Sequence, residues 1–451
     1  MRTFRTKGIY LLTGVIILLS VLAFDGHKDQ LFATTYKNYE ALKIFSDVLT
    51  IIQKNYVEQI DLKSLVYNAI KGMVANLDPH SSFMPPEMYK ELQVETKGSF
   101  GGLGLEITFK DGFLTVVSPI EDTPADRAGI KPGDKIIKIE NELTKDMSLM
   151  DAVKKMRGSP GTQVKISIFR DGMKEPKEYT LTRNVIKIKS VKYKRIDDKF
   201  GYIRLAQFQE DTTREFKRAL KDLESGKQPI KGLILDLRRD PGGLLDQAVN
   251  VSDEFLDSGL IVSTEGRIED QQMKFYAKKN SERHDYPLVV LVNSGSASGS
   301  EIVAGALQDH GRAVIVGTQT FGKGTVQTII PLSDGSGLRL TTAKYFTPNH
   351  RSIQEKGVTP DIIVEDKVKA DSSPVEKFPS IREKDLMNHF KGLGAVKEEK
   401  PPQNKSAAKQ SLIPIKKESE DPPLDTAIEL LKNWQIYNKD NKLFTQAKEN
   451  A

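Results

Sequence analysis

Three of the four serines in a loop of small residues are the first candidates for chemistry in this sequence. The stretch "VVLVNSGSASGSEIVAGALQDHG", residues 289–311, places Ser296, Ser298 and Ser300 between a predicted apolar strand and a predicted helix. Free N–H groups at a helix start stabilise negative charge, such as the oxyanion formed when a serine attacks a carbonyl. Turn and N-cap roles are the alternative, and Ser300, followed by Glu301, fits that alternative better. The loop predicts a serine nucleophile and leaves the choice among the serines open.

A serine hydroxyl needs a base, and no histidine has a persuasive setting. His310 lies at the far end of the helix that follows Ser298, too distant along a helix that rises about 1.5 Å per residue. His80, close to Asp78 in "LDPHSS", is a weak candidate for a Ser-His-Asp triad. The six histidines are His27, His80, His284, His310, His350 and His389.

Lysine can replace histidine as a base when burial disfavours its ammonium form and lowers its pKa. In "GTQTFGKGTVQ", residues 317–327, Lys323 lies between two glycines, on a predicted tight connection inside an α/β core and before a strand that reads as buried. Gln327 is four residues further on, a spacing that keeps the same side of a strand or a helix, so its amide can orient the amine. A solvated loop lysine is the ordinary alternative.

The same stretch looks like a phosphate-binding loop because Gly317, Gly322 and Lys323 match that motif. The motif requires Ser or Thr directly after the lysine to bind Mg²⁺, followed by a helix. Here Gly324 follows, Thr325 comes one residue late, and the next residues alternate like a strand. The sequence therefore disfavours a nucleotide site.

A tetrahedral intermediate needs hydrogen-bond donors for its oxyanion. The stretch "LILDLRRDPGGLL", residues 233–245, reads as a buried strand that ends in a turn of small residues, where the backbone can approach a substrate closely. We expect the N–H groups of Gly243 and Gly299 to form the oxyanion hole. An ordinary strand-to-helix turn is the alternative.

Periodicity divides the chain into regions that must position these residues. Residues 36–97 read as helical, a cap or an element for homodimer formation, and residues 98–187 read as a compact β-rich module. Residues 188–366 alternate strands and helices, which indicates a largely parallel sheet with active groups at the strand C-termini. Residues 367–451 are rich in Lys, Glu, Pro and Ser and predict a solvated linker with a last amphipathic helix that docks back.

Composition limits the function classes. The 451 residues carry a net charge of +6 from 67 basic and 61 acidic side chains, which are mixed along the chain, so nucleic-acid binding is not expected. The chain has no cysteine, which excludes disulfides, thiolate zinc sites and a cysteine nucleophile. The sequence implies no metal, nucleotide or organic cofactor.

The N-terminus predicts export. Residues 8–24 are apolar and uncharged, follow three basic residues and precede Asp25, which predicts an N-terminal membrane anchor within residues 1–26. A cleaved signal peptide is the alternative, although no clear small-residue cleavage site follows. Either reading places the catalytic part outside the cytoplasm, and the anchor reading predicts a single-pass protein of the cytoplasmic membrane that faces the periplasm.

Five stretches together resemble one family, the carboxyl-terminal processing peptidases or tail-specific proteases. They occur in the family's order over about residues 40–366 and read "DPHSSFM", "GLGLEI", "DLRRDPGGLL", "NSGSASGSEIVAGALQD" and "FGKGTVQ". The resemblance implies a PDZ domain before an α/β protease core. Together with the helical N-terminal region and the N-terminal transmembrane helix predicted above, the expected fold is an α/β and α+β multidomain one.

The resemblance also implies roles for single residues. It implies that Ser298 is the nucleophile, Lys323 the general base and Gln327 the support of that base. The family often has alanine where Gly299 stands, a change that keeps the backbone donor. Asp309 matches a family position too, although a structural role at the helix end is an equal alternative.

The implied PDZ domain adds substrate selection. Its loop would bind the C-terminal carboxylate of a protein tail through backbone N–H groups, with apolar side chains forming the pocket. Arg157, at the end of a predicted helix, would couple this domain to the active site; an ordinary exposed helix-end arginine is the alternative. The expected substrate-binding residues are Gly102, Leu103, Gly104, Leu105 and Ile107.

The sequence thus predicts an exported serine endopeptidase that binds unstructured C-terminal tails and cleaves through an acyl-enzyme. Two alternatives stay open at this point: a Ser-His-Asp hydrolase that uses His80, and a noncatalytic PDZ scaffold.

Overall fold

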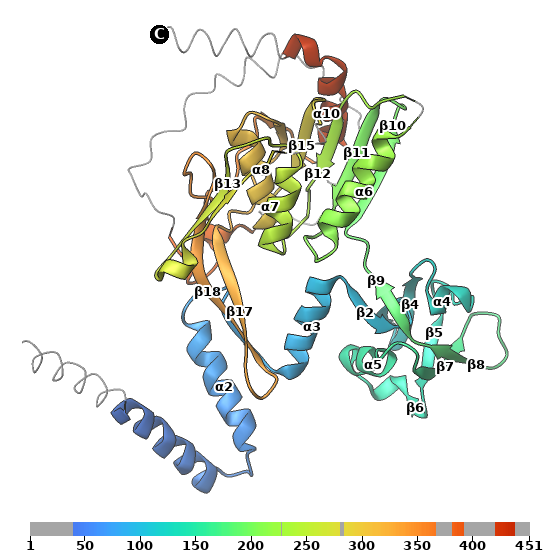
Figure 1. Cartoon of the computed structure of the whole chain (residues 1–451). Helices are drawn as coiled ribbons and strands as arrows, with labels where there is room; N and C mark the ends of the chain where they lie inside the picture. Colours follow the sequence, from blue (N-terminus) through green and yellow to red (C-terminus); the bar gives the residue numbers. More distant parts are fainter. Residues whose placement is uncertain (1–38, 227, 280–283, 367–380, 392–419, 438–451) are drawn as a thin grey trace, which may run out of the picture. The chain divides into compact units, whose positions relative to one another are not determined.

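The computed structural model describes residues 39–226, 228–279, 284–366, 381–391 and 420–437 (Figure 1). The chain separates into two compact units, Met1–Ala75 and Asn76–Ala451.

In the first unit, residues 39–55 are helical and α2 spans Leu62–Ala75. The helix of residues 39–55 leaves large apolar side chains exposed, including Leu42 and Val48. The predicted homodimer through this region stays a prediction. Across the described ranges no helix is both long and apolar enough to cross a membrane, and the predicted anchor lies outside them.

The second unit contains a six-stranded sheet in the order β10-β11-β12-β15-β16-β19 (Figure 1). All neighbours are parallel except β10 and β11. This confirms the largely parallel sheet that the alternation of strands and helices predicted. The strands are β10 Val191–Ile196, β11 Phe200–Leu205, β12 Leu233–Asp236, β15 Leu288–Val292, β16 Val314–Gly317 and β19 Ile362–Ile363.

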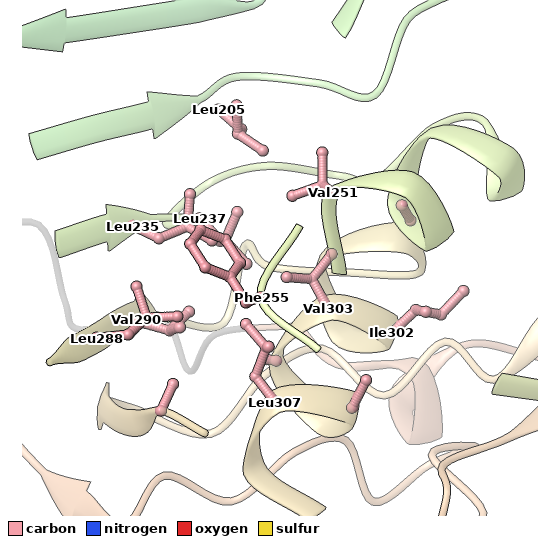
Figure 2. Packing of buried hydrophobic residues seen from close by; sticks show 14 of the residues in the cluster. Leu205, Leu235, Leu237, Val251, Phe255, Leu288, Val290, Ile302, Val303 and Leu307 are labelled. Atoms are coloured by element: carbon pink, nitrogen blue, oxygen red, sulfur yellow. The ribbon is translucent and has the colours of Figure 1, made fainter. Parts of the chain in front are cut away.

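The central strands are apolar on both faces because both faces are covered. On β12, Leu233 and Leu235 join one cluster of buried side chains while Ile234 joins the other, as alternation along a strand requires. Figure 2 shows side chains of β12 and β15 packed in one layer with those of α7 and α8. The helices on this face are α6 Thr212–Glu224, α7 Leu245–Asp253 and α8 Gly299–Asp309.

The opposite face of the sheet is covered by α10, Pro422–Lys432, through Ala427, Leu430 and Leu431. This confirms that the last amphipathic segment docks back. Arg238, at the end of β12, fixes the start of α10 because its guanidinium donates to both carboxylate oxygens of Asp421, at 2.6 and 2.9 Å.

A second, antiparallel sheet carries the strand that follows Lys323. Its order is β1-β18-β13-β14, and β17 pairs with β18. The sequence prediction for β17 was wrong in part: it is a strand, but only Thr325 is buried, and it lies in this sheet rather than in the parallel core. The strands are β1 Ser82–Met84, β13 Leu260–Gly266, β14 Lys274–Tyr276, β17 Thr325–Pro331 and β18 Gly337–Phe346.

The β-rich module is a third sheet, in the order β3-β4-β5-β7-β8, with a core of its own. The chain enters it through α3 and β2 and leaves it through β9, and β2 pairs with β9. Its helices are α4 Pro124–Arg127 and α5 Leu149–Met156. The remaining elements are α3 Pro86–Lys97, β2 Ser99–Gly102, β3 Leu105–Lys110, β4 Phe113–Pro119, β5 Lys135–Ile139, β6 Glu142–Leu143, β7 Gln163–Phe169, β8 Lys177–Thr182 and β9 Asn184–Lys187.

Candidate active site

Ser298 is the N-cap residue of α8, at the C-terminal end of the loop after β15. Its φ of 53° and ψ of −111° lie in a region that residues with a Cβ rarely adopt, a strain of about 1–3 kcal/mol. Such strain persists where the surroundings hold it, and it is common at functional sites.

The two neighbouring serines are buried and already bonded. The Ser296 hydroxyl donates to the carbonyl of Leu237 at 2.8 Å, and the Ser300 hydroxyl donates to the carbonyl of Asp240 at 2.9 Å. Ser300 therefore has a structural role, as expected, but the N-cap of α8 is Ser298 rather than Ser300. Ser298 is the serine of this loop that lines an open cavity.

The turn Asp240–Gly243 lies directly against this serine. A Cβ on Gly242 would stand 2.8 Å from the Ser298 Cβ and 2.7 Å from the Gly299 nitrogen. The Gly242 N–H already donates to Asp240 Oδ1 at 2.8 Å. Within the described part of the chain, the N–H groups of Gly243 and Gly299 donate to no acceptor. These are the two donors expected for the oxyanion hole.

Glu301 joins the serine loop to the loop of Lys323. Its fully buried carboxylate accepts the Ser298 N–H at 2.9 Å, the Gly322 N–H at 2.8 Å and the Lys323 N–H at 2.9 Å. The Thr320 hydroxyl donates to it as well, at 2.5 Å. Burial raises the pKa of Glu301 to about 7, against the effect of these donors. The carboxylate therefore fixes both backbones with respect to each other.

Lys323 has the lowered basicity that a lysine base requires. Burial is the largest cause and lowers the pKa of Lys323 to about 8, and the Arg339 cation adds to this shift. The carboxylates of Glu383, Glu301 and Asp78 act in the opposite direction. At this pKa a substantial share of neutral amine is present near neutral pH.

Tyr345 touches both loops from β18. Its hydroxyl donates to the Lys323 carbonyl, and a side-chain hydrogen bond links it to Ser298. Burial keeps the phenol neutral by raising the pKa of Tyr345 well above its ordinary value.

Gln327 lies on β17, directly after a shift in register between Val326 and Gln327. Its amide donates to the Thr325 hydroxyl at 2.9 Å and to the Thr341 hydroxyl at 3.4 Å. The irregularity breaks the simple alternation from which its side was predicted. Gln327 and Lys323 nevertheless line the same cavity.

This cavity has a volume of about 640 Å³ and collects most of the predicted site. Apolar side chains from α3, β17 and α8, including Leu92, Ile329 and Ile302, form part of its wall. Its chemical side is formed by Gly243, Ser298, Gly299, Lys323, Gln327 and Tyr345.

His80 is engaged elsewhere. Its Nε2 contacts the buried Glu383 carboxylate at 2.8 Å. Asp78 accepts the backbone N–H of His80 at 2.8 Å, and it binds Ser81 and Thr341 rather than the imidazole. A triad in which Asp78 orients the His80 ring does not match this geometry. Asp309 binds Arg351 at the end of α8, a structural role.

The predicted tail-binding loop of the β-rich module lines a smaller cavity of about 70 Å³. Leu103, Gly104, Leu105 and Ile107 line it as expected, together with residues of α5, whereas Gly102 lies in β2. Arg157 is at the rim: it lines the cavity and donates to Glu91 of α3 at 2.6 Å. Its guanidinium also lies 4.5 Å from the centre of the Phe100 ring.

Sequence reasoning missed Glu301, Tyr345 and Glu383 as members of the site. Glu301 offered a signal, because a carboxylate three residues after an N-cap serine is the usual partner of that N-cap. Tyr345 and Glu383 offered no such signal. Tyr345 reaches the site because β18 pairs with β17, and Glu383 because the later chain returns to Phe321.

Three family models match the chain. The first, described as Peptidase family S41, matches residues 199–364. The second, PDZ domain, matches residues 115–170, and the third, Activating protease CtpB N-terminal domain, matches residues 23–88.

Among curated proteins, a "Carboxy-terminal-processing protease" of Bartonella bacilliformis is 45% identical over 396 residues, which is 86% of this chain and 88% of that protein. A "Carboxyl-terminal-processing protease" of Synechocystis sp. is 40% identical over 70% of this chain and 75% of its own length. A "Carboxy-terminal processing protease CtpA" of Bacillus subtilis is 39% identical over 70% of this chain and 67% of that protein.

The peptidase family model over the α/β core and the PDZ model before it define a peptidase of modular build. The chain belongs to the carboxy-terminal processing proteases of peptidase family S41. It is a serine protease, and the noncatalytic scaffold is therefore set aside.

Proposed function

We propose that this protease cleaves with Ser298 as nucleophile and Lys323 as general base. The observation that carries the proposal is the single cavity that Ser298 and Lys323 line together with Gly243 and Gly299, whose N–H groups have no acceptor within the described residues. Two links between the loops support it, one through the Glu301 carboxylate and one through the Tyr345 hydroxyl.

The chemistry follows from these positions. Neutral Lys323 takes the hydroxyl proton of Ser298 while the serine oxygen bonds to the substrate carbonyl carbon. The oxyanion accepts hydrogen bonds from Gly243 and Gly299. When the C–N bond breaks, the Lys323 ammonium returns a proton to the leaving amine. The same amine then takes a proton from water as the water oxygen attacks the ester carbonyl. When the C–O bond to Ser298 breaks, the ammonium returns this proton to the serine oxygen, which restores the free serine and the neutral amine.

The test is proteolysis of a peptide with an apolar, unstructured C-terminus. Ser298→Ala and Lys323→Ala should each lose turnover by at least about 1,000-fold. Ser294→Ala, in the same loop but outside the cavity lining, is the matched control and should cleave like wild type. Equal rates in all four proteins would overturn the assignment, and loss in His80→Ala with a mild Lys323→Ala would favour the histidine alternative.

We also propose that the PDZ module selects substrates by their C-termini. The apolar cavity behind Gly104 suits a small apolar terminal side chain, and the free edge of β3 suits pairing with an extended tail. Arg157 would respond to the binding of a tail in the PDZ cavity, because a bound tail would compete with the hydrogen bond from Arg157 to Glu91 of α3. Helix α3 also contributes Leu92 to the active-site cavity.

This coupling has a direct test. Wild type should cleave a peptide with a free C-terminal carboxylate faster than the same peptide with an amidated terminus. Arg157→Ala should reduce that difference and leave cleavage of the amidated peptide unchanged. If Arg157→Ala cleaves the free peptide faster than the amidated one by as much as wild type does, Arg157 has no role in coupling the PDZ domain to the active site.

Export completes the proposal. The apolar residues 8–24 with their basic flank support a membrane-anchored enzyme with its catalytic part in the periplasm. A phosphatase that is active only outside the cytoplasm, fused after residue 38, should be active only if residues 8–24 direct export.

A further inference from the structure

Residues 381–391 form a segment that lies against the loop of the general base and against residues 354–356, and we name this segment the base strap. Its Glu383 N–H donates to the carbonyl of Phe321 at 3.2 Å. Arg382 donates to the carbonyl of Lys356 at 2.8 Å, and further along His389 contacts the Glu355 carboxylate at 2.7 Å. Nothing in its sequence predicted this, because the surrounding stretch reads as linker.

The central contact of the base strap is the Glu383 carboxylate, which is fully buried. It accepts the Gln354 amide N–H at 2.8 Å and contacts His80 Nε2 at 2.8 Å. The Gln354 amide oxygen in turn accepts the Gly324 N–H at 2.9 Å. The Gln354 side chain therefore links Glu383 to Gly324, the residue directly after Lys323.

The loop around Lys323 needs such restraint because glycines flank the lysine on both sides and glycine backbone is permissive. On one side Glu301 holds the N–H groups of Gly322 and Lys323. On the other side Gln354 packs so closely that a Cβ on Gly324 would stand 2.5 Å from its nitrogen. The loop is thus held between α8 and the residues that the base strap supports.

We propose that the base strap holds Lys323 in its reactive position and that Glu383 is the positioning residue. This inference rests on the proposed function, in which Lys323 is the base. Two elements distant in sequence, the loop of His80 and the base strap, meet at Glu383, so its removal loosens the base loop from outside the substrate cavity.

The charge of Glu383 should affect the pH dependence of activity, which a change in packing alone would leave unaltered. The charged groups that face Lys323 are Arg339 from β18, Glu383 from the base strap, Glu301 from α8 and Asp78 from the loop before β1. Arg339 and the three carboxylates act in opposite directions on the pKa of Lys323. Removing one carboxylate should therefore shift the acid limb of activity downward, and removing the arginine should shift it upward.

The experiment measures kcat and KM against pH for the full chain with the same peptide substrate. Glu383→Gln should lower kcat about 100-fold, leave KM within about twofold, and move the acid limb down by about 1 pH unit. Arg339→Gln should move it up. Asp385→Asn is the matched control, because Asp385 lies in the same turn, is exposed and bonds to the backbone of Arg382. It should match wild type in rate and pH profile.

Glu383→Asp keeps the charge but withdraws the carboxylate by one methylene. It should lower kcat with the acid limb unmoved, and it decides the question if Glu383→Gln does not fold. Wild-type kcat and pH profile in Glu383→Gln, or wild-type kcat in Glu383→Asp, would overturn the proposal. Ser298→Ala runs beside them: cleavage by that variant would refute the proposed function itself, whatever Glu383 does.

Discussion

Replacing Lys323 by Met should stabilise the fold and abolish catalysis. Burial lowers the pKa of Lys323 from 10.5 to about 8, which corresponds to an upper limit of about 3 kcal/mol. The lysine is partly exposed to its cavity, so solvent screening reduces the expected gain to about 1–2 kcal/mol. Methionine removes this penalty because it carries no charge to desolvate.

The gain should depend on pH in one direction. Below pH 8 the lysine is protonated in both the folded and the unfolded chain, and the full penalty is present. As the pH rises from about 8 to 10.5, the folded chain loses its proton first and the penalty declines. Above pH 10.5 both states are neutral, and Lys323→Met and wild type should be equally stable in this respect.

The kinetic counterpart is an acid limb of kcat/KM with a midpoint near pH 8. At pH 7 about one tenth of the amine is then neutral, against about one in 3,000 for an unshifted lysine, a gain of about 300-fold in active base.

Denaturant unfolding at pH 7 and pH 10.5, together with peptide cleavage, checks both parts. Lys192→Met, at an exposed lysine of β10, is the control and should change the free energy of unfolding by less than about 0.5 kcal/mol. A Lys323→Met variant that is less stable than wild type at pH 7, or that keeps turnover, would refute the reasoning.

Three further predictions concern Gly243 of the proposed oxyanion hole, Gln327 beside the proposed base, and Asp421 at the start of α10. Gly243→Ala should lower kcat by about 100- to 1,000-fold in steady-state assays, because φ is 147° there and a Cβ would stand 2.1 Å from the Phe208 carbonyl oxygen. Gln327→Ala should lower kcat by about 100-fold with little change in KM. An unchanged kcat would show that Gln327 does not support the base. Asp421→Ala should reduce the free energy of unfolding by about 1–2 kcal/mol in urea titrations, because Arg238 loses two charged hydrogen bonds.

The parallel sheet was predictable because its signal is local. Strands β12 and β15 read as continuous apolar runs, and each is followed by turn residues and a helix. Ser298 and Lys323 were each located as candidates by such local signals, a helix start and a glycine-flanked loop. The choice of Ser298 among the serines came from the resemblance. The structure is consistent with it, since the hydroxyls of Ser296 and Ser300 are buried and bonded and Ser294 lies outside the cavity lining.

The second sheet and the base strap were not predictable from local pattern. Strand β18 pairs with β13 from about 80 residues earlier in the chain, and with β1 from about 250 residues earlier. Glu383 lies in a stretch whose composition is that of a linker, and only its contacts with His80 and Gln354 make it part of the site. The hydrophobic periodicity of a sequence does not show which residues distant along the chain are in contact.

The arrangement of carboxylates around Lys323 explains how a lysine can serve as the base. Within the described residues no carboxylate forms an ion pair with the Lys323 ammonium. A direct ion pair would favour the charged form and remove the neutral amine that catalysis requires. Glu301 instead accepts hydrogen bonds from backbone N–H groups, and Glu383 accepts one from the Gln354 amide and contacts the His80 ring. The loop is therefore held by charged groups while the amine that it carries stays free to lose its proton.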